Sequence, residues 1–259
     1  MAFENLQVNI GEDFVAELVL NRPRQLNTFN SPMAAELVQA LRQLDEDATA
    51  RVIVLKGAGK AFCAGIDIHE YFDKTANEYR AWVERMEAPL VEITRMRKPV
   101  IAQVQGVAAA NGAGLVAAAD LAVAADNARI GLTAINVGLN CVGPVVPVAR
   151  SVGRKRAMEL LLFGELIPAG KALEMGLVNK IIAADDLDME TARWARALAQ
   201  KSPVALQIAK KAFYTAEDMD YETAFDYMNE AFARLCTAED AAEGIRAFLE
   251  KRKPQWRER

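Results

Sequence analysis

The chain has few of the residues from which metal centres and disulfide frameworks are built. Its 259 residues include one histidine, His69, and three cysteines, Cys63, Cys141 and Cys236. A single histidine argues against a histidine-based metal site. Three widely spaced cysteines, an odd number, are typical of reduced thiols rather than of a disulfide-stabilised secreted protein. We therefore expect no metal site and a reducing compartment.

Excess positive charge is also missing. The 31 lysines and arginines are outnumbered by 35 aspartates and glutamates, which gives a net charge of −4. Nucleic acids and anionic membrane surfaces attract proteins that carry a basic excess. We therefore expect neither a nucleic-acid partner nor a membrane partner.

A membrane-spanning segment is not indicated either. The charge-free run at 99–119 has about the length that spans a bilayer. However, Gln103, Gln105 and Asn111 interrupt it, its alanines contribute little transfer free energy, and no basic flank follows it. The first residues, MAFENLQVNIGEDF, lack the basic start and apolar core of a signal peptide. These absences predict a soluble, cytoplasmic protein.

The sequence does contain a regular succession of strand and helix patterns. Residues 5–10 and 14–20 alternate as the arms of a hairpin, and Ser31 and Pro32 are suited to cap and open an amphipathic helix. Further strands are indicated at 52–56, 100–104, 121–125 and 128–132. Further helices are indicated at 69–97, 185–200, 203–216, 220–235 and 239–251.

This succession predicts the class of fold and its division. No low-complexity linker separates the patterns. We expect an α/β core of repeated strand-strand-helix units over 1–200 and a C-terminal helical subdomain over 201–259.

Two turns of small residues stand out, each where a strand passes into a helix. They are GAGKAFCAGIDI (57–68) and GVAAANGAG (106–114). Helix amino termini carry unpaired N–H groups and a partial positive charge. Two such ends that face one another would bind a single anionic oxygen, as in an oxyanion hole. From the spacing alone, tight packing or a phosphate cradle remain alternatives.

Several longer motifs carry a resemblance to a known family. They are NRPRQLNTF (21–29), the two turns, INVGL (135–139), VGRKRAMELLLFGELIPAGKALEMGLVNKI (152–181) and EGIRAFLEKRKPQW (243–256). In this order, and over nearly the whole chain, they resemble the crotonase superfamily of enoyl-CoA hydratases and isomerases. NVGLNC and the closing segment are particularly similar to its hydratase-domain-containing branch. The resemblance implies a spiral of ββα units with a C-terminal helical trimerisation subdomain, assembled as a homotrimer or dimer of trimers. It also implies an acyl-CoA thioester as substrate and no prosthetic group.

The resemblance also assigns residues to the ligand. The backbone N–H groups of Ile66 and Asn111 match the two oxyanion donors. The family usually has glycine at the second position, so the Asn111 side chain adds bulk or a third donor there. The remaining CoA-binding matches are the adenine and phosphate loop, Arg24, Gln25 and Leu26; the adenine-side wall, Ala64, Asp67 and Ile68 beside Ile66; and two residues offered to a neighbouring subunit's CoA, Phe248 and Lys251. For Arg24 and Lys251, solvated surface charge is the alternative.

The same matching shows that two catalytic glutamates of the family are absent from this chain. The hydratases of this family use two glutamates as acid and base, and the matched positions here hold Gly114 and Ala134. An acid–base group contributes about 10²–10⁴-fold, and an oxyanion donor contributes about 2.7–4 kcal/mol. We therefore expect thioester binding and enolate stabilisation to survive, while proton transfer needs another source.

His69 and Cys141 are the candidates for that source. His69 follows the first turn closely, although a structural histidine at a helix start is an alternative. Cys141 would be a nucleophile only with a lowered pKa, and a small apolar filler is the alternative. Glu70, Tyr71 and Asp73 are weaker options on the same segment as His69.

Two classes of function remain open. The first is an enzyme of the hydratase/isomerase family, a lyase or isomerase acting on acyl-CoA. Within it, decarboxylation of a malonyl-type CoA and thioester hydrolysis are alternatives. Decarboxylation needs no base, since the departing carbon dioxide leaves an enolate behind. The second is a non-catalytic acyl-CoA binder or regulator.

Overall fold

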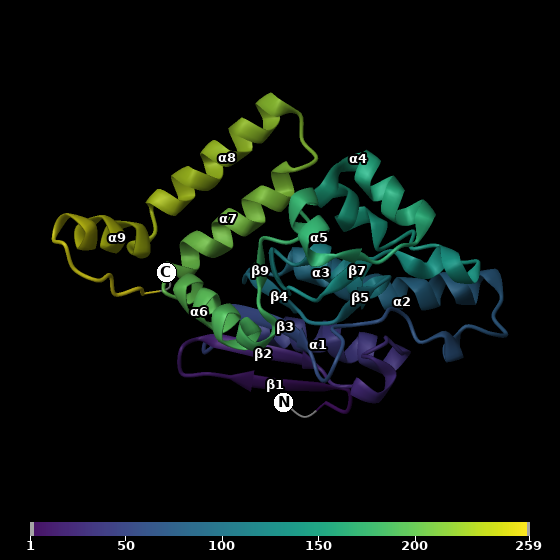
Figure 1. Ribbon diagram of the computed structural model, residues 1–259. Coiled ribbons are helices and arrows are strands. Elements are labelled where there is room, and N and C mark those ends of the chain that lie inside the picture. The colour runs from purple at the N-terminus through teal and green to yellow at the C-terminus, as the bar shows by residue number, and fades with distance from the viewer. Residues whose placement is uncertain (1–2, 258–259) are drawn as a thin grey trace.

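The main sheet of the molecule has six strands in the order β1-β2-β3-β4-β6-β9 (Figure 1). The computed structural model describes residues 3–257. β1 and β2 form the expected antiparallel hairpin, and the remaining neighbours are parallel. The strands are β1 (Leu6–Ile10), β2 (Val15–Leu20), β3 (Val52–Gly57), β4 (Val100–Val104), β6 (Leu121–Ala125) and β9 (Lys180–Ile182). The β-branched runs at 52–56 and 100–104 are nearly free of solvent, as buried parallel strands require.

A smaller second sheet lies beside the first. It contains β5 (Val107–Ala109), β7 (Arg129–Gly131) and β8 (Ile167–Pro168). β4 is followed by β5 and helix α3, and β6 is followed by β7 and a 3₁₀ helix, so each unit gives one strand to each sheet. This repetition confirms the predicted spiral of ββα units.

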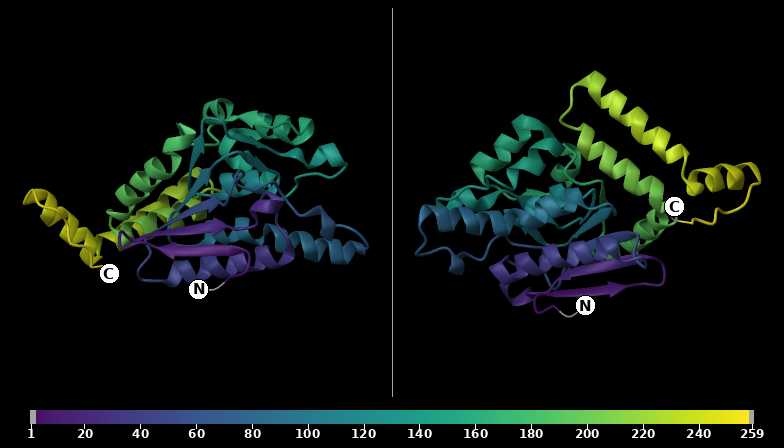
Figure 2. Two further views of the ribbon diagram at one scale, coloured as in Figure 1. Left: turned by 60° about the horizontal axis from the view of Figure 1, so that its bottom comes forward. Right: turned by 180° about the vertical axis from the view of Figure 1, so that it is seen from behind.

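Helices cover the sheets and extend beyond them (Figures 1 and 2). The α-helices are α1 (Ser31–Glu46), α2 (Ala76–Arg95), α3 (Asn111–Ala118), α4 (Val145–Phe163), α5 (Ala169–Met175), α6 (Leu187–Ala199), α7 (Pro203–Ala216), α8 (Tyr221–Cys236) and α9 (Glu239–Leu249). The 3₁₀ helices are η1 (Pro23–Gln25), η2 (Ile68–Glu70), η3 (Thr133–Val137) and η4 (Ala184–Asp186). None of the helices within 3–257 is long and apolar enough to cross a membrane.

The cap of α1 differs from the prediction. Asn30 is the capping residue, because its backbone is extended and its side chain accepts a hydrogen bond from the Met33 N–H at 3.0 Å. Ser31 is the first helical residue, and its hydroxyl donates to Glu70 at 2.6 Å. The predicted Ser31 cap was therefore wrong by one residue.

The segment predicted as one helix over 69–97 is divided. η2 and an irregular stretch come first, and α2 begins at Ala76, where Thr75 and Glu78 cap each other's backbone groups. The buried side of α2 includes Trp82, Met86 and Leu90. This face is directed at the interior beside α3.

The C-terminal helices differ in how they meet the body. In α7, Lys210 donates to Asp120 at 2.7 Å and Tyr214 donates to the same carboxylate at 3.0 Å, so this helix is fastened to the core. α8 and α9 project from the body (Figure 1), and α8 has no buried residue. The division into 1–200 and 201–259 stays a prediction.

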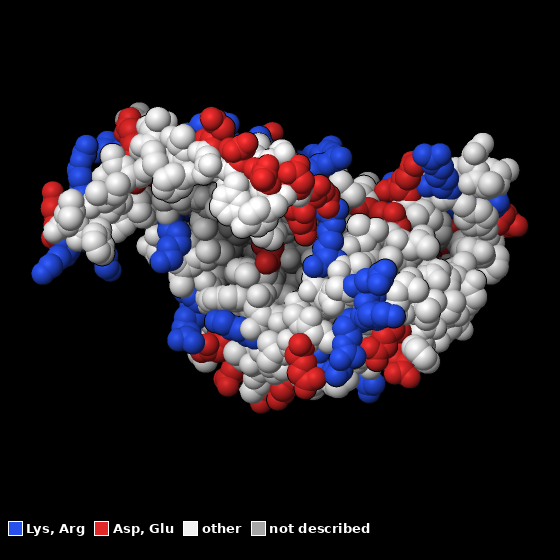
Figure 3. Space-filling view, turned by 90° about the horizontal axis from the view of Figure 1, so that it is seen from above, with Lys and Arg blue, Asp and Glu red and all other residues white. Residues whose placement is uncertain are grey.

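Charges of both signs are mixed on the surface. Seen from above, Figure 3 shows lysines and arginines interspersed with aspartates and glutamates, and mainly uncharged side chains lining a central hollow.

Candidate active site

The first small-residue turn is held against the second by a short ladder of backbone hydrogen bonds. Cys63 donates to the Val107 carbonyl at 3.1 Å, and Ala109 donates to the Cys63 carbonyl at 2.9 Å. Residues around Cys63 thus run parallel to β5, which leads directly into α3. Two segments more than forty residues apart therefore meet edge to edge.

Two glycines allow this close approach. A Cβ on Gly112 would overlap the Cys63 carbonyl, which is rigid backbone. Gly65 has φ +108°, and a Cβ there would lie 3.1 Å from the Cβ of Ala110. The bareness of both turns is therefore a requirement of their packing.

The Ile66 N–H is left unpaired by the bonds that surround it. Phe29 donates to the Gly65 carbonyl at 2.8 Å, and Asp67 donates to the Phe29 carbonyl at 2.6 Å. This parallel bridge pairs the Gly65 carbonyl before Ile66 and the Asp67 N–H after it with the backbone of Phe29. The Ile66 N–H itself has no acceptor among the described residues.

The Asn111 N–H is unpaired for a different reason. Asn111 is the first residue of α3, so its N–H has no carbonyl one turn earlier in the helix. Nor does it have another acceptor within residues 3–257. Ala110 before it has the strained angles φ 49° and ψ −113°, held by its N–H bond to the Gly131 carbonyl at 2.9 Å. Such strain costs about 1–3 kcal/mol and persists where the surroundings fix it.

The Asn111 side chain is directed away from the cavity. Its amide donates to the Met86 carbonyl of α2 at 3.1 Å, and the residue is 2% exposed. The departure from the family's glycine therefore ties α3 to α2. It does not supply a third donor.

Ile66 and Asn111 both line one cavity of about 450 Å³. Its wall is mainly apolar, which suits a small-molecule site. The wall includes Ala64, Ile66, Ile68, Tyr71, Tyr79, Trp82, Val83, Glu87, Asn111, Ala134 and Cys141. The described residues contain no group of three or more metal-ligating side chains.

The two positions that lack glutamate are not equivalent in space. Ala134 lines the cavity. At Gly114, an added Cβ would lie 2.7 Å from Leu90 Cδ2 and 3.0 Å from Pro144 Cβ. The space that a longer side chain needs at 114 is therefore occupied.

One carboxylate on the cavity wall was missed in the sequence. The carboxylate of Glu87 on α2 lies directly against the backbone of Gly143. Burial raises the pKa of Glu87 above its usual range, against the lowering effect of the nearby Gly143 backbone. A Cβ on Gly143 would overlap the Glu87 carboxylate, so Gly143 provides its resting place.

A signal for Glu87 was present in the helical spacing of α2. Trp82, Met86 and Leu90 are buried at intervals of four. Val83 and Glu87 follow one position later and therefore lie on the adjoining stripe. The glutamate resembled an ordinary solvated charge until α3 and the 138–144 loop were placed opposite it.

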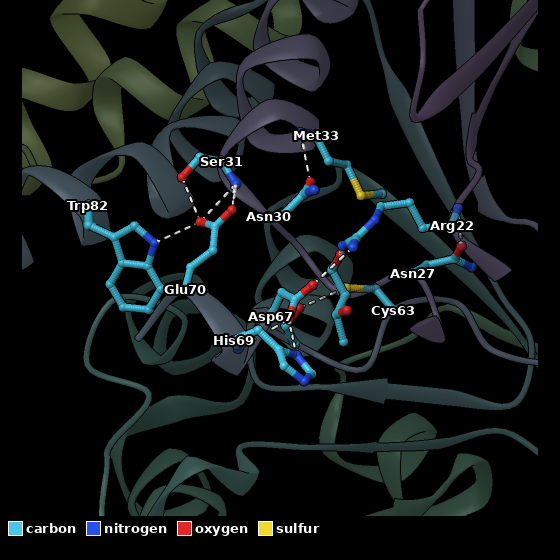
Figure 4. Close-up of polar contacts among 12 residues, drawn as sticks. Arg22, Asn27, Asn30, Ser31, Met33, Cys63, Asp67, His69, Glu70 and Trp82 are labelled. Atoms are coloured by element: carbon cyan, nitrogen blue, oxygen red, sulfur yellow. Dashed lines mark hydrogen bonds and ion pairs between the residues drawn. The ribbon is translucent and has the colours of Figure 1, made fainter. Parts of the chain in front are cut away.

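His69 is not among the residues that line the cavity, and it lies beside Asp67 (Figure 4). Its Nδ1 lies 2.9 Å from Asp67 Oδ1, and its side chain is 92% exposed. Arg22 donates to the other Asp67 oxygen at 2.9 Å. Burial raises the pKa of Asp67, but the hydrogen bonds from His69 and Arg22 outweigh it and hold the pKa below its usual range. His69 is therefore directed toward Asp67 and solvent, and its role as a proton carrier stays a prediction.

Cys141 does line the cavity, but it is not activated. It is 3% exposed, and burial raises the pKa of its thiol. A nucleophilic thiol needs the opposite shift. The geometry therefore favours the apolar filler.

The three weaker candidates for proton transfer, Glu70, Tyr71 and Asp73, differ in where they lie. The Glu70 carboxylate accepts hydrogen bonds from the Ser31 hydroxyl and, at 3.1 Å, from the Trp82 indole (Figure 4). These bonds connect α1 to α2. Tyr71 lines the cavity, whereas Asp73 does not. Glu70 thus has a structural role.

The CoA-binding candidates fall into two places. Arg24 and Gln25 are exposed in η1, and the Leu26 carbonyl accepts from the Ala64 N–H at 3.0 Å, so this loop adjoins the cavity wall. Phe248, 82% exposed, and Lys251 lie at the end of α9, away from the body (Figure 1). Within one chain, these two residues do not reach the cavity.

Comparison with known proteins agrees with this architecture. The profile of the enoyl-CoA hydratase/isomerase family matches residues 11–259. The human mitochondrial enoyl-CoA hydratase domain-containing protein 3 is 36% identical over 94% of this chain and 81% of its own length. The 1,2-epoxyphenylacetyl-CoA isomerase of Escherichia coli is 37% identical over 95% of each chain.

A solved structure extends the likeness to three dimensions. An enoyl-CoA hydratase from Mycobacterium smegmatis superposes with a TM-score of 0.94 at 39% identity, over 98% of this chain and 99% of that chain. The crotonase fold and the family predicted from the motifs are thereby confirmed. The chain belongs to the enoyl-CoA hydratase/isomerase family.

Proposed function

We propose that the protein is an enzyme that binds acyl-CoA and stabilises its thioester enolate with the N–H groups of Ile66 and Asn111. The observation that carries the proposal is that both N–H groups lack a partner and border one cavity. Donors fixed before the reaction stabilise developing charge without reorganisation. The apolar wall strengthens such interactions by excluding water.

The reaction class that fits this site is that of a lyase or isomerase. Standard hydration needs one group to activate water and another to protonate the α-carbon. With Gly114 and Ala134 at the family's glutamate positions, that pair is missing. Decarboxylation of a malonyl-type thioester and thioester hydrolysis are the alternative reactions, and binding without turnover is the non-enzymatic alternative.

The CoA portion is assigned to the η1 loop. Arg24 is exposed and therefore available to phosphate, and Leu26 connects this loop to Ala64 on the cavity wall. Asp67 is committed to Arg22 and His69, so its contribution beside the adenine is to hold the loop in place.

A homotrimer or dimer of trimers completes the proposal. The C-terminal helices expose large apolar side chains, which a monomer rarely leaves uncovered. Among them, Phe225 is 54% exposed, Phe232 66% and Phe248 82%. In such an assembly Phe248 and Lys251 would reach a neighbour's CoA. Light scattering should give a trimer or hexamer mass, and a monomer would contradict this part.

Titration with acetoacetyl-CoA tests the central proposal, because the enolate of a 3-oxoacyl thioester has its own ultraviolet band. We expect a saturable enolate band, which free CoA used as a control does not produce. Binding without that band would contradict the oxyanion hole. No binding would contradict acyl-CoA as the ligand.

A substrate panel then separates the reactions. Hydration of crotonyl-CoA, isomerisation of 3-hexenoyl-CoA, decarboxylation of malonyl-CoA and hydrolysis of each thioester are followed in parallel. Turnover in the usual enzyme range of about 1–10³ s⁻¹ identifies the activity. Rapid hydration of crotonyl-CoA would contradict the argument from the missing glutamates.

A further inference from the structure

Glu87 occupies a place in the cavity that the family's two glutamate positions do not account for. Among the described residues that line the cavity, it is the one carboxylate. It comes from α2, whereas Gly114 belongs to α3 and Ala134 to η3. A proton carrier is the component that the matched positions lack.

The position of Glu87 is fixed relative to the oxyanion turn. Met86, the residue before it, accepts the hydrogen bond from the Asn111 side chain at 3.1 Å. Met86 is fully buried, and Trp82 one turn earlier is 6% exposed, so this part of α2 is well packed. The backbone that carries Glu87 is thus joined directly to the residue whose N–H faces the thioester.

The Glu87 side chain is held from the opposite wall. Its carboxylate lies against the Gly143 backbone, in the loop that also places Cys141 and Pro144 on the cavity. A second cavity of about 460 Å³, lined by Leu90, Val146 and Phe213 among others, begins on its other side. Glu87 therefore stands between two spaces and retains room to move its carboxylate.

We propose that Glu87 is the proton-transfer group of this site and that the reaction is isomerisation of a β,γ-unsaturated acyl-CoA to the α,β-unsaturated thioester. The proposal rests on the enolate-stabilising function above. It assigns acid–base chemistry to α2, where neither the family's glutamate positions nor His69 and Cys141 supply it.

The reaction balances with one carboxylate and no co-reactant. Glu87 removes a proton from the α-carbon, and the C–H electron pair moves toward the carbonyl to give a dienolate. The N–H groups of Ile66 and Asn111 hold the negative oxygen. The Glu87 acid then returns the proton to the γ-carbon, while the α,β double bond forms and the thioester carbonyl is restored.

The order of these two proton transfers explains why a single carboxylate suffices. The same group acts as base and then as acid, so the two proton transfers occur in turn. Hydration also requires water to be activated while the α-carbon is protonated, and the cavity offers no second carboxylate among its described residues.

Other titratable and charged groups near Glu87 must be distinguished from it in a pH profile. Those on the thioester cavity are Tyr71, Tyr79 and Cys141. Those on the second cavity are Asp120, Arg150, Tyr214 and Glu217. Burial raises the pKa of Tyr79, Cys141 and Tyr214, so these three stay neutral in acid. The variant below identifies the contribution of Glu87 among the remaining carboxylates.

Glu87→Gln tests the assignment with 3-hexenoyl-CoA as substrate. We expect kcat to fall about 10²–10⁴-fold, with the enolate band of bound acetoacetyl-CoA retained. The rate at which the α-protons of hexanoyl-CoA exchange in heavy water should fall together with kcat. Because Glu87 must be ionised to act as base, wild-type kcat should rise with pH through a value above the usual glutamate range, and the variant should lack that rise.

Two further variants complete the design. Glu84→Gln, one turn away on the exposed side of α2, removes a surface pair with Arg80 and should leave kcat unchanged. Gly143→Ala should displace the Glu87 carboxylate and lower kcat while the protein stays folded. Glu87→Asp, with a shorter reach, should retain part of the activity.

The outcomes separate this proposal from the one on which it rests. Loss of the enolate band in the wild-type protein would contradict the oxyanion hole itself. An enolate band without isomerisation or exchange, or a Glu87→Gln variant within threefold of wild type, would overturn the assignment of Glu87 and leave the oxyanion hole intact.

Discussion

In the proposed function, the two small-residue turns and the α2 wall contribute to the same cavity by different means. The turns act through backbone N–H groups, and their sequence consists of the small residues that allow two segments to touch. The α2 wall acts through side chains, such as Trp82 and Glu87, that project from a regular helix. The backbone contribution therefore depends on small residues that let the two turns approach each other. The side-chain contribution depends on which face of the helix is directed at the cavity.

This difference explains how the proposed site could work without the family's glutamates. A backbone donor at Ile66 or Asn111 does not depend on a carboxylate at 114 or 134. A side-chain function can be supplied by another element with access to the same space. The following predictions separate the two kinds of contribution.

The largest effect is expected at Gly112. Gly112→Ala places a methyl group against the Cys63 carbonyl, so the two turns must separate. We expect a loss of about 3 kcal/mol in the free energy of unfolding and loss of the acetoacetyl-CoA enolate band. Denaturant unfolding and the spectral titration measure these effects. Gly170→Ala in α5, which meets no atom within 4 Å, is the matched control and should be neutral or stabilising.

Gly114→Glu should fail to restore a hydratase. Its side chain would meet Leu90 and Pro144, and overpacking of this kind costs about 1–3 kcal/mol. Ala134→Glu faces the cavity and should be better tolerated. Thermal unfolding and crotonyl-CoA hydration of both single variants and the pair provide the test. Strong hydration by Gly114→Glu alone would contradict the packing argument.

Asn111→Ala distinguishes the side chain of Asn111 from its backbone N–H, the proposed oxyanion donor. The variant keeps the N–H but deprives the Met86 carbonyl of the side-chain amide, at a cost of about 1–3 kcal/mol. We expect lower stability and slower proton transfer, with the enolate band still present. Loss of the band with unchanged stability would show that the side chain itself contacts the oxygen.

The smallest effect concerns Asp67 and is confined to acid. Because its folded pKa lies below the unfolded value, Asp67 stabilises the protein above the unfolded pKa of about 3.9. This contribution is lost as pH falls through the folded pKa. Asp67→Asn should therefore be less stable than wild type near neutrality, with the difference shrinking below about pH 4. Urea unfolding at several pH values measures it, and a difference independent of pH would contradict the assignment.

Much of the fold could be predicted because its determinants are local. The β-branched runs that became β3 and β4 and the helical spacing of α6 to α9 contain their own signals. The three-residue strand β5 was missed because it is defined by its partners, Cys63 on one side and β7 on the other.

The site was predictable to a different degree. Ile66 and Asn111 came from motif matching, and the structure places both on one cavity with unpaired N–H groups. Glu87 could not be distinguished from its solvated neighbours on α2, because Gly143, which packs against its carboxylate, lies more than fifty residues away in the sequence. His69 is adjacent to the turn in sequence, yet its bond to Asp67 directs it outward.

The hydrogen bond from Asn111 to Met86 has a consequence for how this enzyme can evolve. It makes the turn proposed to hold the thioester oxygen and the helix that carries the proposed proton-transfer group depend on one another. A substitution at position 111 would change which substitutions α2 tolerates, and the reverse also holds. Epistasis between these two segments is therefore built into the site, and a lineage that restored glycine at 111 would first have to find another way to anchor α2.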